Sequence, residues 1–154
     1  MNIILEGPDC SGKTTLSKTL VEKLKCEYVH LDSKTQYKTY KNVLNHSNEY
    51  KVIDRHWPSE LVYGLTFRNG PTLNINEMIN YCDKKRTLYI VCLPPKDLVE
   101  KHFNKRLAKE EFNTVDKVYD LYAAIAGAWK GFQKYDYTQH TIKQVMQYIN
   151  SYAN

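Results

Sequence analysis

The sequence predicts an α/β fold in which one parallel sheet is covered by helices on both faces. Four short apolar runs have the length and composition of buried strands: 2–6, 27–31, 50–54 and 87–93. Segments with helical periodicity separate these runs, and strands that alternate with helices pair in parallel. Since the 154 residues contain no internal repeat and no linker, we expect a single domain over 1–154.

Helical periodicity and capping residues place the helices between these strands. The expected helices cover 13–25, 34–47, 58–67, 75–84, a stretch that opens after Pro95, 115–129 and 140–152, and a last edge strand covers 133–138. The stretch 115–129 carries an apolar residue every three or four positions, as one face of a helix requires. Pro58 suits the first turn of a helix, and Asn74 suits an N-cap.

The segment from Gly7 to Thr14, between the first strand and the first helix, reads G-x-x-x-x-G-K-T, the pattern of a phosphate-binding loop. Its glycines let the backbone curl around an anion at a helix N-terminus, where the partial charge is positive. We expect Lys13 to reach the β- and γ-phosphates of a nucleotide and the Thr14 hydroxyl to bind Mg²⁺. The other positions expected at the phosphates are Gly7, Asp9, Cys10, Ser11, Gly12 and Thr15. The alternative is a glycine turn before a helix, with a chance lysine.

Asp54 ends the third strand and Arg55 follows it, at the edge of the sheet where the phosphate loop also lies. The carboxyl ends of parallel strands meet at one edge, so Asp54 is expected to face the loop. A carboxylate there can hold Mg²⁺ through water or accept a proton from an attacking oxygen. Arg55 is suited to a bidentate grip on a phosphate. The alternative is a structural Asp–Arg pair near the end of a strand.

Three further residues near this edge have both a functional and a structural interpretation. Asp9 lies inside the loop, where it either accepts a hydrogen bond from a sugar hydroxyl or shapes a tight turn. Asp32 follows the second strand, where it either contacts a substrate hydroxyl or caps the next helix. Trp57 is the best candidate for stacking on a base because it neighbours Arg55, although aromatic residues more often lie in a core.

A basic segment follows the fourth strand. Residues 101–111 carry a histidine, lysines and an arginine, followed by two acids. Arg106 and Lys109 are three apart, so they would share a helix face. We expect a lid at about 101–113 that presents these cations, closes over the transferring phosphoryl group and excludes water. The alternative is a solvated basic face of a helix, the usual meaning of a charge run.

Composition narrows the class of protein. The net charge of +5 is compatible with anionic substrates such as nucleotides and does not by itself indicate nucleic-acid binding. The four cysteines form no C-x-x-C pair, so neither a zinc site nor a redox dithiol is indicated. No segment reaches transmembrane length, and the amino-terminal apolar run is too short for a signal peptide. We therefore expect a cytoplasmic protein with no membrane partner.

Two segments together resemble the thymidylate kinase family. The segment 5–15 resembles its phosphate loop, F/L-E-G-x-D/E-x-x-G-K-S/T-T, and 54–63 resembles its D-R-Y/F-x-x-S-x-x-A-Y segment. The resemblance implies the P-loop NTPase fold, a three-layer α/β/α sandwich with five parallel strands in the order 2-3-1-4-5. It also implies that the γ-phosphoryl group of ATP is transferred, with Mg²⁺, to a deoxynucleoside monophosphate such as dTMP.

The same resemblance implies roles for residues on the acceptor side. Arg55 would hold the phosphate of the acceptor, and Asp9 would meet its sugar hydroxyl. Ser59 and Tyr63 would line the acceptor site. These roles place the acceptor beside the donor phosphates, as phosphoryl transfer requires.

On the donor side, the resemblance implies that Lys13 and Arg106 stabilise the transferred group. Some members of the family carry an arginine in the loop at the position of Cys10, so here the lid cation is expected to supply that charge. The family's R-E-P-G segment after the second strand is missing. The chain is also short for the family, as a compact viral form working in a host cytoplasm would be.

These departures leave the acceptor open. A nucleoside, or a hydroxyl on a modified base within DNA, is the alternative to a nucleotide. A nucleotide-binding module without transfer activity is a further alternative, although no N-K-x-D guanine signature is present. Homodimers are common in the family, which predicts a homodimer here by analogy alone.

Overall fold

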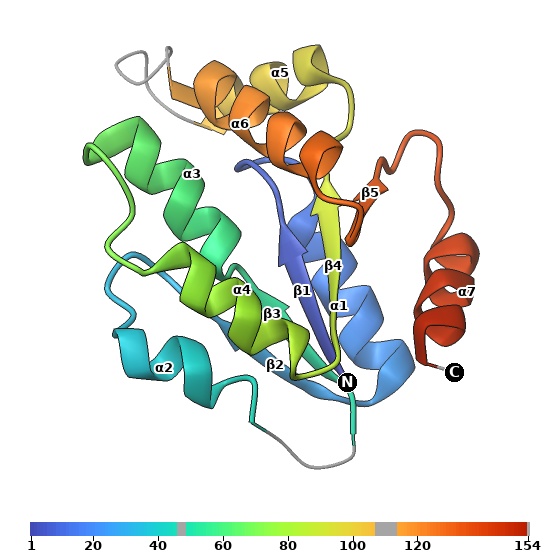
Figure 1. The fold of residues 1–154 in the computed structure, drawn as a ribbon. Coiled ribbons are helices and arrows are strands. Elements are labelled where there is room, and N and C mark those ends of the chain that lie inside the picture. The colour runs from blue at the N-terminus through green and yellow to red at the C-terminus, as the bar shows by residue number, and fades with distance from the viewer. Residues whose placement is uncertain (46–48, 107–113, 154) are drawn as a thin grey trace.

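The computed structural model describes residues 1–45, 49–106 and 114–153. Its sheet has five strands in the order β2-β3-β1-β4-β5, and every neighbouring pair is parallel. The strands are β1 (Asn2–Glu6), β2 (Glu27–His30), β3 (Lys51–Asp54), β4 (Thr87–Cys92) and β5 (Phe132–Tyr135). The expected α/β fold and its 2-3-1-4-5 strand order are confirmed (Figure 1).

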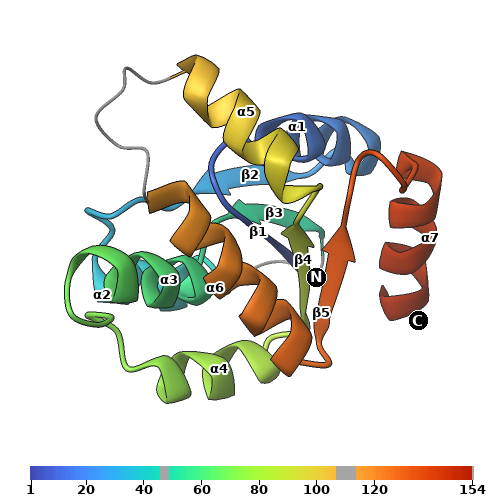
Figure 2. The ribbon, with the colours of Figure 1, turned by 90° about the horizontal axis from the view of Figure 1, so that it is seen from above.

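The described helices lie on both faces of this sheet (Figure 2). They are α1 (Lys13–Leu24), α2 (Tyr37–Asn42), α3 (Trp57–Phe67), α4 (Ile75–Asp83), α5 (Lys96–Arg106), α6 (Thr114–Ala128) and α7 (Ile142–Ala153). Side chains alternate between the two faces along a strand, so Ile3 packs with α1 and α7, whereas Ile4 packs with α2, α3 and α4. The helix α6 packs against α3 over the same face as Ile4. The result is the three-layer arrangement that the alternating pattern predicts.

Two element boundaries differ from the expected ones for local reasons. The helix expected at 34–47 begins only at Tyr37, because the Asp32 carboxylate accepts hydrogen bonds from Lys34 N and Thr35 Oγ1 and forms a turn before α2. The last strand ends at Tyr135 instead of 138, because the Asp136 carboxylate accepts hydrogen bonds from the backbone N–H and the hydroxyl of Thr138. Short polar side chains of this kind offer the backbone an alternative to a helix or a strand.

Other local predictions are confirmed. The Asn74 side chain accepts a hydrogen bond from Glu77 N at 3.1 Å and caps α4. Pro58 lies in the first turn of α3. Of the helices that the structure describes, none combines the length and the apolar character that crossing a bilayer requires.

Candidate active site

The loop between β1 and α1 has the backbone conformation that its glycines allow. Gly7 has φ of 135° and Gly12 has φ of 89°, values that side-chain-bearing residues rarely adopt. A Cβ atom on Gly7 would lie 2.5 Å from the carbonyl oxygen of Cys92, so the close approach of the loop to β4 also requires glycine. The loop leads directly into the N-terminus of α1, where backbone N–H groups favour an anion.

Lys13 is the first residue of α1, and its ammonium group is buried against the loop. Its Nζ donates hydrogen bonds to the carbonyl oxygens of Gly7 at 2.8 Å and Pro8 at 2.7 Å, and the residue is 7% exposed. Burial, helped by the nearby Arg55, lowers the pKa of Lys13 to about 8. A phosphate that reaches this group would stabilise its charged form.

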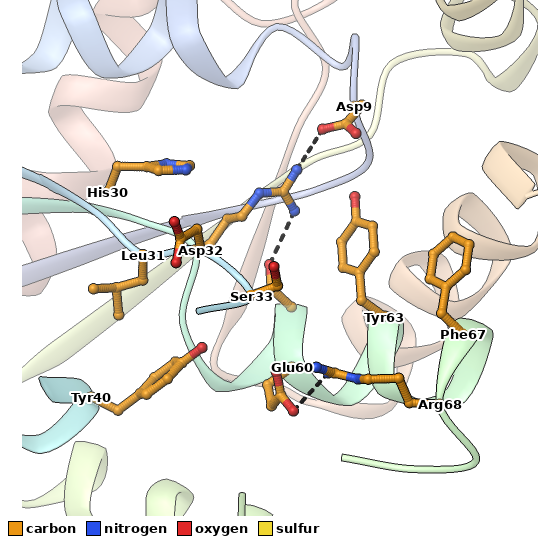
Figure 3. Close-up of a pocket in the computed structure, with 12 residues that line it drawn as sticks. Asp9, His30, Leu31, Asp32, Ser33, Tyr40, Glu60, Tyr63, Phe67 and Arg68 are labelled. Atoms are coloured by element: carbon orange, nitrogen blue, oxygen red, sulfur yellow. Dashed lines mark hydrogen bonds and ion pairs between the residues drawn. The ribbon is translucent and has the colours of Figure 1, made fainter. Parts of the chain in front are cut away.

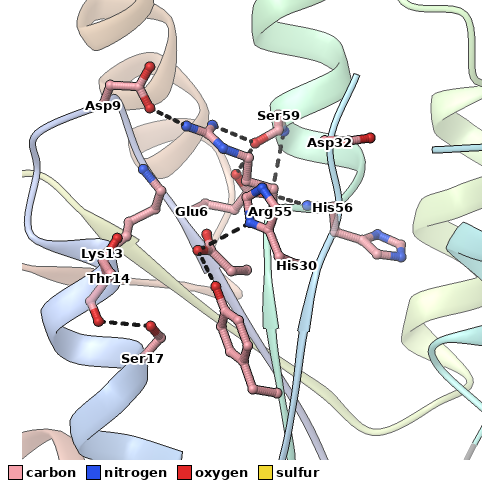
Figure 4. Close-up of polar contacts among 12 residues, drawn as sticks. Glu6, Asp9, Lys13, Thr14, Ser17, His30, Asp32, Arg55, His56 and Ser59 are labelled. Atoms are coloured by element: carbon pink, nitrogen blue, oxygen red, sulfur yellow. Dashed lines mark hydrogen bonds and ion pairs between the residues drawn. The ribbon is translucent and has the colours of Figure 1, made fainter. Parts of the chain in front are cut away.

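A cavity of about 560 Å³ opens at this edge of the sheet. Its lining includes Lys13, Thr14, Thr15, Asp54 and Arg55. The phosphate loop and the end of β3 therefore face the same space, as their positions at the carboxyl ends of neighbouring strands predict. Figure 4 shows Lys13 and Arg55 extending toward this edge from different elements, with Asp9 beside them.

The carboxylate of Asp54 is only partly satisfied by protein groups. Its Oδ2 accepts a hydrogen bond from the Tyr28 hydroxyl at 2.9 Å and lies 3.4 Å from His30 Nδ1. Its Oδ1 is buried, and within the described ranges no donor bonds to it. Mg²⁺ prefers oxygen ligands and keeps several waters, so this free oxygen and the exposed Thr14 hydroxyl in the same cavity fit a hydrated Mg²⁺.

Arg55 is held at the end of β3 by several side chains. Its guanidinium donates hydrogen bonds to Asp9 Oδ1 at 2.5 Å and Ser59 Oγ at 3.2 Å (Figure 4). It also lies 4.9 Å from the centre of the Tyr63 ring. Its backbone has φ of 72°, which is a strained conformation for a residue with a side chain. Such strain is found where a structure fixes a functional side chain.

Glu6 organises this region and was not among the expected site residues. The residue is completely buried at the end of β1, and its carboxylate accepts hydrogen bonds from His56 N at 2.6 Å, Ser59 Oγ at 2.7 Å and the Tyr122 hydroxyl at 3.0 Å. Burial raises its pKa, and the hydrogen bonds oppose that rise only in part. The carboxylate therefore ties β1 to α3 and α6. A charged residue in an otherwise apolar strand was the available signal.

A second cavity, of about 330 Å³, shares part of its lining with the first. Figure 3 shows the residues around this second cavity. Its lining includes five of the residues expected on the acceptor side: Asp9, Asp32, Arg55, Ser59 and Tyr63. Asp9, His30 and Arg55 line both cavities. The Arg55–Asp9 pair thus stands where the two spaces meet.

Trp57 does not belong to this site, which corrects the expectation that it stacks on a base. The residue is 1% exposed and lies outside the lining of either cavity. Its ring packs against Tyr89 and Phe132, with centres 6.1 and 6.0 Å away, and its Nε1 donates a hydrogen bond to the Tyr89 hydroxyl at 2.9 Å. The first turn of α3 directs this side chain into the sheet, so Trp57 is a core residue.

Two expected residues have a mixed outcome. Asp32 lines the second cavity, so its contact with a substrate hydroxyl stays a prediction. Its carboxylate accepts the hydrogen bonds of a turn before α2 and does not cap that helix, whose N-cap position is Gln36. Arg106 is the last residue of α5, and the part of the lid at 107–113 lies outside the described residues. The role of the lid therefore stays a prediction.

Solved structures of other proteins have the same fold as this chain. No family model and no curated protein match the sequence. The YorR protein from Bacillus subtilis, solved with phosphorylated GDP, is 22% identical with a TM-score of 0.79, over 97% of this chain and 93% of that one. Deoxyadenosine kinase from M. mycoides with bound dATP is 14% identical with a TM-score of 0.64, over 100% of both chains. The same kinase with bound dCTP is 16% identical with a TM-score of 0.64, over 98% of this chain and 100% of that one.

The chain has the α/β P-loop fold. The TM-scores and the nearly complete coverage show the fold. Identities this low do not transfer a substrate.

Proposed function

We propose that the protein is a nucleotide kinase that transfers the γ-phosphoryl group of ATP to a deoxynucleoside monophosphate. The observation that carries this proposal is the contact between two cavities at Arg55. One cavity contains the phosphate loop with Lys13, and the other contains Ser59 and Tyr63. Two substrates bound in these cavities would have their reacting groups side by side, which is the main requirement for phosphoryl transfer.

The charges at the junction are suited to the developing charge of the transferring group. Lys13 would exchange its hydrogen bonds to the loop carbonyls for the donor's phosphate oxygens. Arg55 lines both cavities, so it can contact the acceptor phosphate and the transferring group. Preorganised cations in a water-poor site stabilise such charge strongly. Mg²⁺, held by Thr14 and through water by Asp54, would neutralise charge on the donor phosphates.

Asp9 holds Arg55 in place, and this pairing bears on the acceptor. Because Asp9 already neutralises part of the guanidinium charge, Arg55 is less available for a phosphate than an unpaired arginine would be. This observation favours a second candidate, an uncharged hydroxyl acceptor such as a nucleoside. A hydroxyl on a modified base in DNA belongs to the same chemical class.

A screen of acceptors with labelled ATP and Mg²⁺ tests the proposal. Nucleosides, nucleoside monophosphates and DNA are offered in parallel, with the Lys13→Met variant as the control for contaminating kinases. We expect acceptor-dependent ADP formation that the variant loses. Transfer to nucleosides alone would select the second candidate. ATP binding without transfer to any acceptor would refute both and support a nucleotide-binding module.

A further inference from the structure

The second cavity, which we call the acceptor cavity, has a second charged pair on the side away from Asp9. Glu60 and Arg68 line this side, as Figure 3 shows. Apolar and aromatic groups lie between the two charged ends, with Leu31 and Tyr40 on one side in this view and Tyr63 and Phe67 on the other. A cavity with charged ends and flat apolar walls suits a nucleoside, whose sugar lies at one end and whose base lies at the other.

The carboxylate of Glu60 is buried and ionised, and one of its two oxygens accepts several hydrogen bonds. Its Oε1 accepts hydrogen bonds from Arg68 Nη2 at 2.7 Å, Thr72 N at 2.9 Å and Thr72 Oγ1 at 2.8 Å, and the residue is 6% exposed. Burial opposes ionisation, but the hydrogen bonds from Thr72 and Arg68 outweigh it and hold the pKa of Glu60 below its usual range. In the described part of the chain, no hydrogen bond reaches Oε2, the second oxygen.

Arg68 is fixed beside Glu60 by the end of α3. The backbone N–H groups of Arg68 and Gly70 both donate to the carbonyl oxygen of Gly64, at 2.9 and 3.0 Å. A Cβ atom on Gly64 would lie 2.7 Å from the Gly70 carbonyl oxygen, so this tight return of the chain requires glycine. One guanidinium nitrogen bonds to Glu60, which leaves further N–H donors of Arg68 for a ligand.

We propose that Glu60 and Arg68 read the base of the acceptor, and that this base carries an exocyclic amino group next to a hydrogen-bond acceptor. The free oxygen of Glu60 would accept from the amino group, and Arg68 would donate to the neighbouring ring nitrogen or carbonyl oxygen. Guanine, cytosine and adenine present such an edge. The inference rests on the proposed acceptor role of this cavity and replaces the thymine implied by the resemblance.

Thymine fits this pair poorly for an electrostatic reason. It presents a single N–H between two carbonyl oxygens, so a carboxylate that accepts from it is brought close to two like partial charges. A buried carboxylate left without its donor loses the hydrogen bond and keeps its desolvation cost. Sites built to bond a polar group reject analogues that lack it by large factors.

The test compares four monophosphates, dGMP, dCMP, dAMP and dTMP, and the corresponding nucleosides. Both kcat/KM and calorimetric affinity are measured, so that binding is judged separately from transfer. We expect at least one amino-bearing base to exceed thymine by about 100-fold. In Glu60→Gln this ratio should fall by about tenfold or more, and Arg68→Met should lower it independently. Glu77→Gln, which removes an exposed carboxylate paired with Lys41 outside both cavities, should leave the ratio unchanged.

Each outcome decides one of the two proposals. If no acceptor is phosphorylated, but an amino-bearing base still binds more tightly than thymine and Glu60→Gln removes the difference, the kinase proposal fails and the base inference stands. If thymine is preferred, or if Glu60→Gln weakens all four bases alike with an unchanged melting temperature, the base inference is overturned. Absence of binding by every base also overturns it.

Discussion

Replacing Lys13 with methionine should make the unliganded protein more stable while it removes activity. Burial keeps the pKa of Lys13 at about 8 instead of the ordinary 10.5. At about 1.4 kcal/mol per pKa unit, this corresponds to about 3 kcal/mol that the charged form costs the folded state at pH 7. Methionine fills a similar volume without the charge and forms helices comparably well. The carbonyl groups of Gly7 and Pro8 lose their donor, so we expect a gain of about 1–3 kcal/mol.

The pH dependence of the stability provides a second, independent test of this prediction. Between pH 8 and 10.5 the unfolded chain still binds the proton that folded Lys13 has lost, so the stability of the wild type rises over this window. The advantage of the variant should therefore be largest below pH 8 and should shrink as the pH approaches 10.5. Urea unfolding without nucleotide at pH 7 and at pH 9.5 measures both quantities.

The control is Lys18→Met, which removes an exposed lysine from the same helix and should change stability by less than about 0.5 kcal/mol.

ATP at a hundredfold excess over its Kd should stabilise the wild type by about 2.7 kcal/mol, and Lys13→Met should lose most of this gain. Phosphoryl transfer in the variant should fall by about 100-fold or more. A Lys13→Met protein that is clearly less stable than the wild type at pH 7 would refute the reasoning.

Three further substitutions test other parts of the site. Arg55→Ala should raise the KM for the acceptor by about tenfold or more and that for ATP much less, and steady-state kinetics with an unchanged acceptor KM would contradict its assignment. Gly7→Ala should lower the free energy of unfolding by more than about 2 kcal/mol, because φ is 135° and the new Cβ would lie 2.5 Å from Cys92 O; urea midpoints equal to the wild type would count against this geometry. Tyr122→Phe should cost about 1–3 kcal/mol in thermal unfolding, since buried Glu6 loses a donor, and an unaltered melting temperature would mean that this hydrogen bond contributes nothing.

Some errors at the site have a common physical origin. Trp57 neighbours Arg55 in the sequence, and that proximity suggested a place at the ligand. The rings that pack against it, those of Tyr89, Trp129 and Phe132, come from more than thirty residues later in the chain. Whether an aromatic ring faces a ligand or a core depends on which distant elements cover it, and no local pattern carries that information.

The pair of Glu60 and Arg68 was missed for a related reason. The two residues belong to no motif, and each looks like an ordinary surface charge of a helix end. They become a candidate binding group only when α3, the turn after it and Thr72 are packed together around one cavity. Glu6 was visible as a charge in an apolar strand, but its partners on α3 and α6 were not.

The sequence determined the alternation of strands and helices along the chain, the phosphate loop, and the edge of the sheet at which Asp54 and Arg55 lie. Those features depend on periodicity, glycine positions and the shared direction of parallel strands, all of which are local or follow from a general rule. The tertiary structure decided which side chains face the two cavities, which carboxylates are already satisfied, and which charged pair lines the second cavity. These properties arise from contacts between segments far apart in the chain, so they exist only once the chain is folded.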